Sequence, residues 1–265
     1  MGTIRLCPPY LDPGRLNPLA AGFPGKGLRV AKKISHEQVS GPAVIVACRV
    51  MEPELEYVRR GSDNVEVRYV DQGLHRTPRK MAESVQEQID AVRDYAARIV
   101  LGYGLCSNGI AGVTAREQGL IVPKCHDCIA FFLGSLAAYR ESFETRPGTY
   151  YLTPGWVAEK KDPLGIMQEE YAPKFGLETA QWVMEEELKH YTHIALIDTG
   201  VADIVPLRRR AEENAAYFKK GYQEIKSEGL DLFFKLATGP YEEDFFILEP
   251  GEVVTQEMFI ELPDA

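Results

Sequence analysis

Short apolar runs separated by turn-forming residues recur along the chain from residue 42 onward. Residues 44–47 are continuously apolar, which is typical of a strand buried on both faces, and residues 65–70 alternate as a second strand would. Acidic residues and a proline at 52–54, and Thr77-Pro78, mark the starts of two predicted helices. Apolar residues in steps of three and four over 81–92 predict that the second helix is amphipathic.

The pattern continues through residues 98–134, where chemically reactive side chains follow the strands. An apolar run at 99–101 ends in a glycine-bracketed turn that presents Cys106. A second run at 120–122 ends in Lys124-Cys125-His126-Asp127-Cys128, and a helix-like apolar stretch follows. Since ligands collect at the carboxyl ends of strands in open α/β sheets, these groups are candidates for a site.

The second half of the chain predicts similar elements. We expect strands at 149–152, 193–197, 230–236 and 245–248, a charged helix at 207–222, and a helix over 177–190 with Trp182, Val183 and Leu188 on or near its apolar face. The alternation predicts an α/β fold with two similar Rossmann-like halves, in which helices cover parallel sheets and a cleft separates the halves. The predicted units are an N-terminal arm (1–40), a first half with the cysteine cluster (41–147) and a second half (148–265).

The arm is rich in proline and glycine and has little apolar periodicity. We interpret it as a segment that packs on the body or on a partner subunit, which leaves a homo-oligomer open. Cys7 belongs to this arm, and the sequence does not assign it a role.

Charge and cysteine content narrow the class of protein. The net charge of −9 and a pI near 5.2 argue against a broad nucleic-acid or anionic-membrane surface. The N-terminus lacks the apolar segment of a signal peptide, and no apolar stretch approaches the roughly 20 residues of a membrane span. Five cysteines, an odd number, fit reduced thiols better than a disulfide framework. We expect a cytoplasmic protein that acts on a small molecule.

Three cysteines follow three different predicted strands, and the fold could bring them to one edge. Cys48, Cys106 and Cys128 would then form a metal centre with one open position, because thiolates are soft ligands. An iron–sulfur cluster is slightly favoured over zinc. Cys125 and Cys128 form a C-x2-C, but the sequence has no second C-x2-C to complete a zinc knuckle. A redox pair formed by Cys125 and Cys128 remains an alternative. Buried, unreactive cysteines are the remaining alternative.

Other side chains near the cysteines are candidates for acid–base and binding roles. His126 is a candidate ligand or acid–base group, and Asp127 a hydrogen-bond acceptor for a ligand or a helix cap. His75 could enter the same cleft, but we expect it on a surface loop. The residues expected to bind substrate are Tyr103, Asn108, Tyr151 and Trp156.

Four segments carry a resemblance to a known family. VIVACRVMEPEL, GYGLCSNGIAG, PKCHDCIAFFLGS and PGTYYLTPGW resemble a prokaryotic family catalogued as a domain of unknown function. The resemblance covers roughly residues 43–250 and leaves the arm outside. Its G-L-C-x-N-G, H-D-C-I and T-Y-Y-x-x-P-G-W motifs match at Gly104–Gly109, His126–Ile129 and Thr149–Trp156, whereas Cys125 departs from the family's pattern.

Members of that family are often encoded beside corrinoid-dependent methyltransferases in anaerobes, which implies one-carbon metabolism by association. We therefore expect a metal-dependent enzyme of one-carbon or methyl-group metabolism that acts on a small molecule. The alternative is a non-catalytic accessory protein that binds a corrinoid protein or a methyltransferase through its arm and acidic face.

Overall fold

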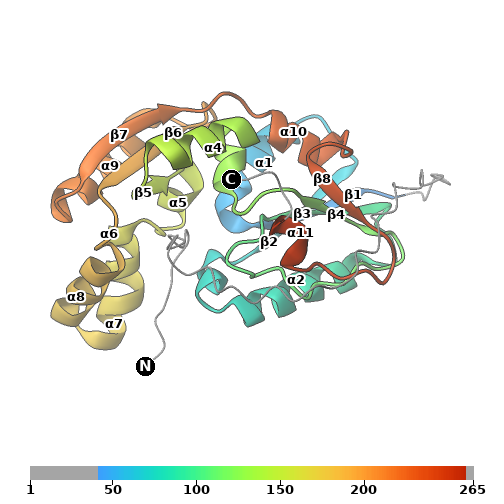
Figure 1. Ribbon diagram of the computed structural model, residues 1–265, viewed down its shortest axis with the longest axis horizontal. Helices are drawn as coiled ribbons and strands as arrows, with labels where there is room; N and C mark the ends of the chain where they lie inside the picture. Colours follow the sequence, from blue (N-terminus) through green and yellow to red (C-terminus); the bar gives the residue numbers. More distant parts are fainter. Residues whose placement is uncertain (1–40, 261–265) are drawn as a thin grey trace, which may run out of the picture.

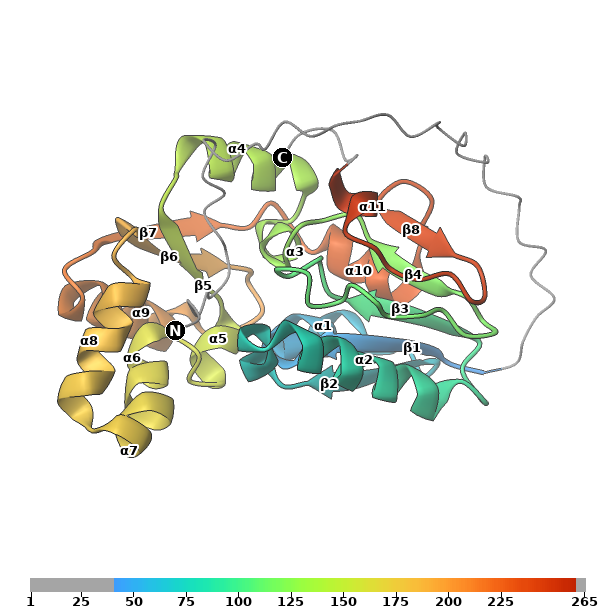
Figure 2. The same ribbon diagram turned by 60° about the horizontal axis from the view of Figure 1, so that its bottom comes forward.

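Two β-sheets lie side by side in the computed structural model, which describes residues 41–260 (Figures 1 and 2). The first sheet has the order β2-β1-β3-β4-β8. Its strands are β1 (Ala43–Cys48), β2 (Val65–Val70), β3 (Arg98–Gly102), β4 (Leu120–Pro123) and β8 (Phe245–Leu248). Strands β1 to β4 pair in parallel, and β8 is antiparallel to β4.

The second sheet is smaller and parallel, with the order β5-β6-β7. Its strands are β5 (Thr149–Leu152), β6 (His193–Asp198) and β7 (Gly221–Lys226). The expected α/β class with helix-covered, mainly parallel sheets is therefore confirmed. The two sheets differ in size, with five strands in the first, to which the chain returns at β8, and three in the second.

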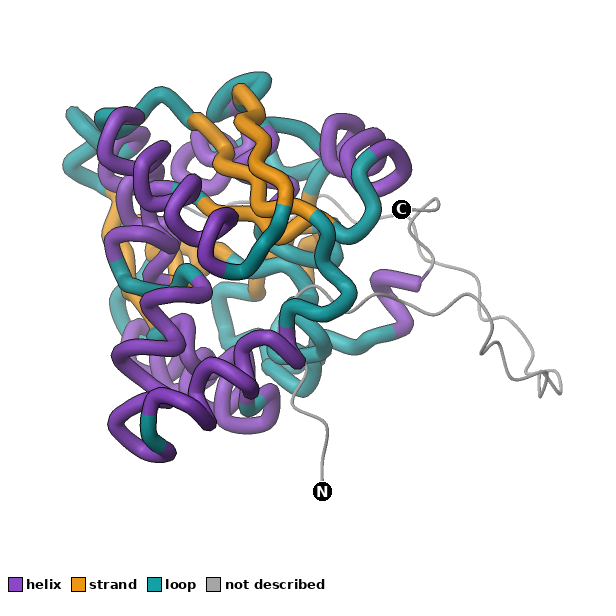
Figure 3. The backbone as a smooth tube through the Cα atoms, turned by 90° about the vertical axis from the view of Figure 1, so that its left-hand side faces the viewer, coloured by secondary structure: helices purple, strands orange, loops and turns teal. Residues whose placement is uncertain are grey.

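Helices cover the faces of both sheets, and the strands run between them (Figure 3). On the first sheet, α2 contacts β1 and β2 from one side, while α10 contacts β1 and β3 from the other (Figure 1). On the second sheet, α9 packs on β6 and β7. The longer helices are α1 (Glu52–Val58), α2 (Pro78–Val92), α4 (Leu136–Thr145), α8 (Leu177–Glu187), α9 (Ile204–Tyr217) and α10 (Asp231–Thr238).

The remaining helical segments are short and connect the longer elements. They are η1 (Arg49–Met51), η2 (Gln72–Arg76), α3 (Ile129–Leu133), α5 (Pro154–Ala158), α6 (Pro163–Ile166), η3 (Met167–Tyr171, a π-helix), α7 (Ala172–Phe175) and α11 (Glu257–Ile260). Together α6, η3, α7 and α8 form a helical cluster beside the second sheet (Figure 1). Among residues 41–260, no helix is both long and apolar enough to cross a bilayer.

Three predictions about secondary structure are wrong. The strand predicted at 230–236 is instead the N-cap and first six residues of helix α10, whose buried positions 232, 233, 236 and 237 follow a helical period. The charged helix predicted at 207–222 extends too far. Residues 221–226 form strand β7 instead and pair with β6 despite their polar side chains. Trp182 is 63% exposed, and Ala180 and Met184 form the buried face of α8 instead.

Between β3 and β4 the chain forms a turn-rich loop, residues 103–119, and this described segment has no helix. The expected boundary after residue 147 separates β1–β4 from β5–β7, and α10 and β8 then return to the first sheet. The N-terminal arm and Cys7 lie outside the described residues.

Specific contacts join the two sheets and their helices. Gly155 of α5 lies against η1 so closely that a Cβ atom there would meet the Val50 carbonyl oxygen at 1.8 Å. The Thr199 hydroxyl, just after β6, donates a 2.7 Å hydrogen bond to the carboxyl of Glu54 on α1. Glu54 is fully buried, and its other oxygen has no protein partner.

Glu54 provides a test of this packing. Burial raises the pKa of Glu54 to about 7, against the hydrogen bond from Thr199 that lowers it. The fold therefore favours the protonated acid, and the free energy of unfolding should fall as the pH rises from about 4.5 to 7. Glu54→Gln should be more stable than the wild type by about 1–3 kcal/mol above pH 7, with the difference shrinking toward pH 4.5.

Urea denaturation at pH 5 and pH 8 measures this difference. Glu178→Gln, at an exposed position of α8, is the matched control and should change little at either pH. A Glu54→Gln variant less stable than the wild type at pH 8 would contradict the prediction.

Candidate functional site

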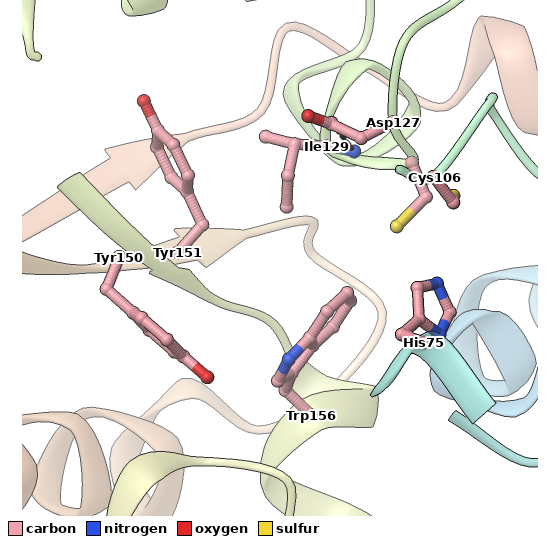
Figure 4. Close-up of a pocket in the computed structure, with 8 residues that line it drawn as sticks. His75, Cys106, Asp127, Ile129, Tyr150, Tyr151 and Trp156 are labelled. Carbon is pink, nitrogen blue, oxygen red and sulfur yellow. Dashed lines mark hydrogen bonds between the residues drawn. The ribbon is translucent and has the colours of Figure 1, made fainter. Parts of the chain in front are cut away.

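A pocket lies between the first sheet and the β5–α5 segment of the second (Figure 4). It is lined by His75, Cys106, Asp127, Cys128, Ile129, Tyr150, Tyr151 and Trp156. The polar and sulfur-containing groups come from the first sheet, and the aromatic groups come from β5 and α5.

The parallel pairing of β1–β4 explains why these polar groups meet. Cys48 ends β1, His75 lies in η2 just after β2, Cys106 follows β3, and Cys128 lies between β4 and α3. Since the carboxyl ends of parallel strands point the same way, all four side chains gather at one edge of the sheet.

The loop after β3 holds Cys106 in an uncommon backbone conformation. Cys106, Ser107 and Asn108 have φ values of 49°, 56° and 68°, three consecutive residues in the left-handed region. The backbone N–H of Cys106 donates to the carbonyl of His126 at 2.9 Å, which fixes the loop against the segment after β4. Gly104 allows this approach, because a Cβ atom there would lie 2.7 Å from the Asp127 backbone. Strained backbone of this kind clusters at functional sites.

His75 is buried beside Cys106, and its ring is oriented by the backbone. Its Nδ1 lies 2.8 Å from the Gln72 carbonyl oxygen, so Nδ1 carries a proton and Nε2 is left for Cys106. The imidazole makes a side-chain hydrogen bond to the Cys106 sulfur. Burial alone would lower the pKa of His75, but the hydrogen bond and negative charge of Cys106 outweigh it and raise that pKa.

Cys106 differs from the other three cysteines of residues 41–260 in its pKa. A hydrogen bond from the Cys128 thiol has the largest effect, and His75 adds to it against the opposing effect of burial, which lowers the pKa of Cys106 to about 5. The pKa of Cys128 is raised, first because it donates this bond and second because it is buried. Burial also raises the pKa values of Cys48 and Cys125. Cys106 is thus the thiol favoured as thiolate at neutral pH.

Asp127 places a carboxyl group on the same pocket wall. Its oxygens accept hydrogen bonds from the Tyr139 hydroxyl at 2.8 Å and from the Ile129 backbone N–H at 2.9 Å. Burial raises the pKa of Asp127 to about 6, although these hydrogen bonds lower it. The group is therefore a carboxylate above pH 6 and a carboxylic acid below it.

The aromatic wall is positioned by α5 and β5. Thr153 caps α5 by accepting a hydrogen bond from the Trp156 backbone N–H, and the indole packs edge-on against Phe132 at 5.9 Å. The Tyr151 hydroxyl lies 2.7 Å from the Ser142 hydroxyl. These contacts hold the rings in place at the pocket.

The structure separates the predicted site residues into two groups. Those that line the pocket are Cys106, Asp127, Cys128, Tyr151 and Trp156. Four predicted residues do not line it. Cys48 and Tyr103 are buried behind it with their side chains next to each other. His126 is half-buried, and Asn108 is exposed and hydrogen-bonds to Gln256. The catalytic and binding roles of these residues stay predictions.

The expectation of a surface position for His75 is wrong, because only 5% of it is exposed. Its signal in the sequence was the same as that of the cysteines, a position just after a strand. Tyr150 and Ile129, which also line the pocket, neighbour predicted site residues but carry no distinguishing signal. Among residues 41–260, no group of three or more His, Cys, Asp or Glu side chains has the arrangement of a metal site.

The low pKa of Cys106 predicts an unusual pH profile for alkylation. Because the thiolate is the nucleophile, modification of Cys106 by iodoacetamide should change little between pH 6 and 8, whereas an ordinary thiol reacts about tenfold faster per pH unit there. Mass spectrometry of the labelled peptide measures the rate. In His75→Ala, the thiolate loses a stabilising hydrogen bond and the profile should shift to higher pH.

Cys125→Ser is the matched control for this experiment, since Cys125 is buried and does not line the pocket. It should leave the profile of Cys106 unchanged. A rate for Cys106 that rises through pH 8 like that of a free thiol would contradict the assignment.

Comparisons with known proteins place the chain in a family. No curated protein and no solved structure matches it. A family model described as "Protein of unknown function (DUF1638)" matches residues 69–236, more than half of the chain. The match includes His75, Cys106, Cys128 and the aromatic wall, while Cys48 lies outside it. The chain therefore belongs to the DUF1638 family of proteins of unknown function.

Proposed function

We propose that this protein is an enzyme that acts on a small molecule through the thiolate of Cys106, with His75 as its acid–base partner. The observation that carries the proposal is one series of contacts at the pocket wall. The Gln72 carbonyl orients His75, His75 contacts Cys106, and Cys128 donates to Cys106. Nucleophilic catalysis generally uses a nucleophile that is hydrogen-bonded to a base, with a third group that orients the base.

The proposed chemistry uses these groups in order. The Cys106 thiol gives its proton to Nε2 of His75, which forms a thiolate and an imidazolium. The thiolate sulfur then bonds to an electrophilic carbon of the substrate, and the leaving group departs with its electron pair and takes the proton from His75. The thiol of Cys128 stabilises the negative sulfur before attack.

The rest of the pocket suits a small, largely apolar substrate. The aromatic wall and Ile129 exclude water from the sulfur, which strengthens the electrostatic interactions within the site. Cys128 and Asp127 are the remaining polar groups on the thiolate side of the pocket.

An activated ester tests the proposal without knowledge of the natural substrate. With 4-nitrophenyl acetate, we expect a burst of about one nitrophenolate per chain and an acetyl group on Cys106, seen by intact-mass spectrometry and peptide mapping. The burst rate should fall by at least about tenfold in His75→Ala, since general base assistance contributes roughly 10²–10⁴-fold.

Two variants make the result decisive. Cys106→Ala should abolish the burst, and Cys125→Ala should keep it. Acetylation spread over several cysteines, or a rate equal to that of free cysteine, would overturn the proposal and favour the accessory-protein alternative.

A soft metal centre is a second candidate, because two side chains with soft or borderline donor atoms adjoin the Cys106 sulfur. Cys106 contacts both Cys128 and His75, and Cys48 interacts electrostatically with Cys106 from behind the pocket. Two sulfurs and one nitrogen form the donor set of some catalytic zinc sites, so this proposal favours zinc over an iron–sulfur cluster, which is held mainly by thiolates. A bound zinc ion would supply Lewis-acid activation of a thiolate or water.

The methyl-group chemistry implied by the family resemblance belongs to the same proposal. A free or zinc-bound Cys106 thiolate has the nucleophilicity to accept a methyl group, and a corrinoid protein would be one donor of it. That partner and that reaction rest on the resemblance alone.

Elemental analysis of protein purified without oxygen tests the metal candidate. If a metal is held here, we expect about one zinc per chain, loss of that zinc in Cys106→Ser and His75→Ala, and retention in Cys125→Ser. Each variant should keep the wild-type circular dichroism spectrum. Metal-free wild type, or full zinc content in Cys106→Ser, would exclude this candidate.

A further inference from the structure

The side of the pocket opposite Cys106 is built almost entirely from aromatic rings. Tyr150 and Tyr151 come from β5, Trp156 comes from α5, and Ile129 completes the wall (Figure 4). Three rings from two consecutive elements thus surround one small volume. Aromatic rings present negative faces, and several around one space form the usual receptor for a bulky organic cation.

Residues that do not line the pocket hold the three rings in place. The Tyr151 hydroxyl lies against Ser142, and in Figure 4 it points away from Cys106 and Trp156. Tyr150 packs edge-on against Tyr191 at 5.3 Å, and Trp156 against Phe132 at 5.9 Å. The rings therefore offer a ligand hydrocarbon and π surface, together with the Tyr150 hydroxyl, which points toward Trp156 in Figure 4.

The charges around the pocket favour a positive ligand. The Cys106 thiolate and the His75 imidazolium compensate each other, and Asp127 adds one negative charge. None of the eight lining residues is Lys or Arg. Both Asp127 oxygens already accept hydrogen bonds, from Tyr139 and from Ile129. This carboxylate therefore offers a ligand mainly its negative charge and not a free hydrogen-bond acceptor.

We propose that the pocket binds a methylated organic cation, a quaternary ammonium or a sulfonium, with its methyl groups against Tyr150, Tyr151 and Trp156 and its charge balanced by Asp127. Such a cation has no N–H to donate, which matches a wall of rings and a carboxylate whose oxygens are occupied. This inference rests on the proposed function and names the substrate class for the same site.

A pair of isosteric probes tests the charge directly. Choline and its neutral carbon analogue 3,3-dimethylbutan-1-ol have nearly the same shape, so they differ mainly in charge. Comparing choline with trimethylsulfonium shows whether the pocket prefers an ammonium or a sulfonium cation. By titration calorimetry at pH 8, we expect choline or trimethylsulfonium to bind about tenfold or more tightly than the neutral alcohol.

Matched variants locate the binding. Trp156→Leu and Asp127→Asn should each weaken cation binding by about tenfold, with less effect on the alcohol. Trp182→Leu, at an exposed tryptophan outside the pocket, should leave it unchanged. Thermal unfolding of each variant shows that it folds.

Cys106→Ser separates this inference from the proposed function. It should still bind the cation, because the rings and Asp127 are intact, while it loses reactivity toward activated esters. Equal affinity for choline and the alcohol, or no binding of either cation by wild-type protein whose Cys106 is reactive, would overturn the inference and leave the proposed function standing.

Discussion

The parallel alignment of β1–β4 is the constraint on which the candidate site depends. Each strand contributes its next side chain or loop at the same edge, so residues far apart in sequence, such as Cys48 and Cys128, become neighbours. No single contiguous sequence motif forms the site, because the parallel arrangement of the strands brings its residues together. The second sheet adds the opposite wall through α5, whose Gly155 lets its backbone approach η1 closely.

Electrostatics at this edge are arranged in compensating pairs. A buried thiolate would be costly alone, but the imidazolium of His75 and the thiol of Cys128 both stabilise it. Asp127 is similarly supported by the Tyr139 hydroxyl and a backbone N–H. Glu54, deep between the sheets, has a hydrogen bond to one oxygen only, from Thr199, and its protonated form is favoured. Of these two buried acids, Asp127 is therefore the one that the fold keeps charged near neutral pH.

Much of the first sheet could be predicted from the sequence, because continuous apolar runs such as 44–47 and the periodic helix α2 are local signals. α10 was mistaken for a strand, since a short apolar run has no periodicity long enough to distinguish the two, and only packing on β1 and β3 decides. For the site, Cys106 and Cys128 were predictable as residues after strands. The burial of His75 was not, because it depends on the loop after β3 folding over it.

That loop and the first sheet are completed by the C-terminal part of the chain. β8 covers the edge of β4, and residues 112–115 exchange backbone hydrogen bonds with residues 252–254. During synthesis, β4 therefore remains an open edge until about 120 further residues have been made, roughly 10 s at typical rates of translation. Until then the loop that presents Cys106 also lacks its hydrogen bonds to residues 252–254, so the nascent chain carries an unpaired strand edge beside the segment that will form the site.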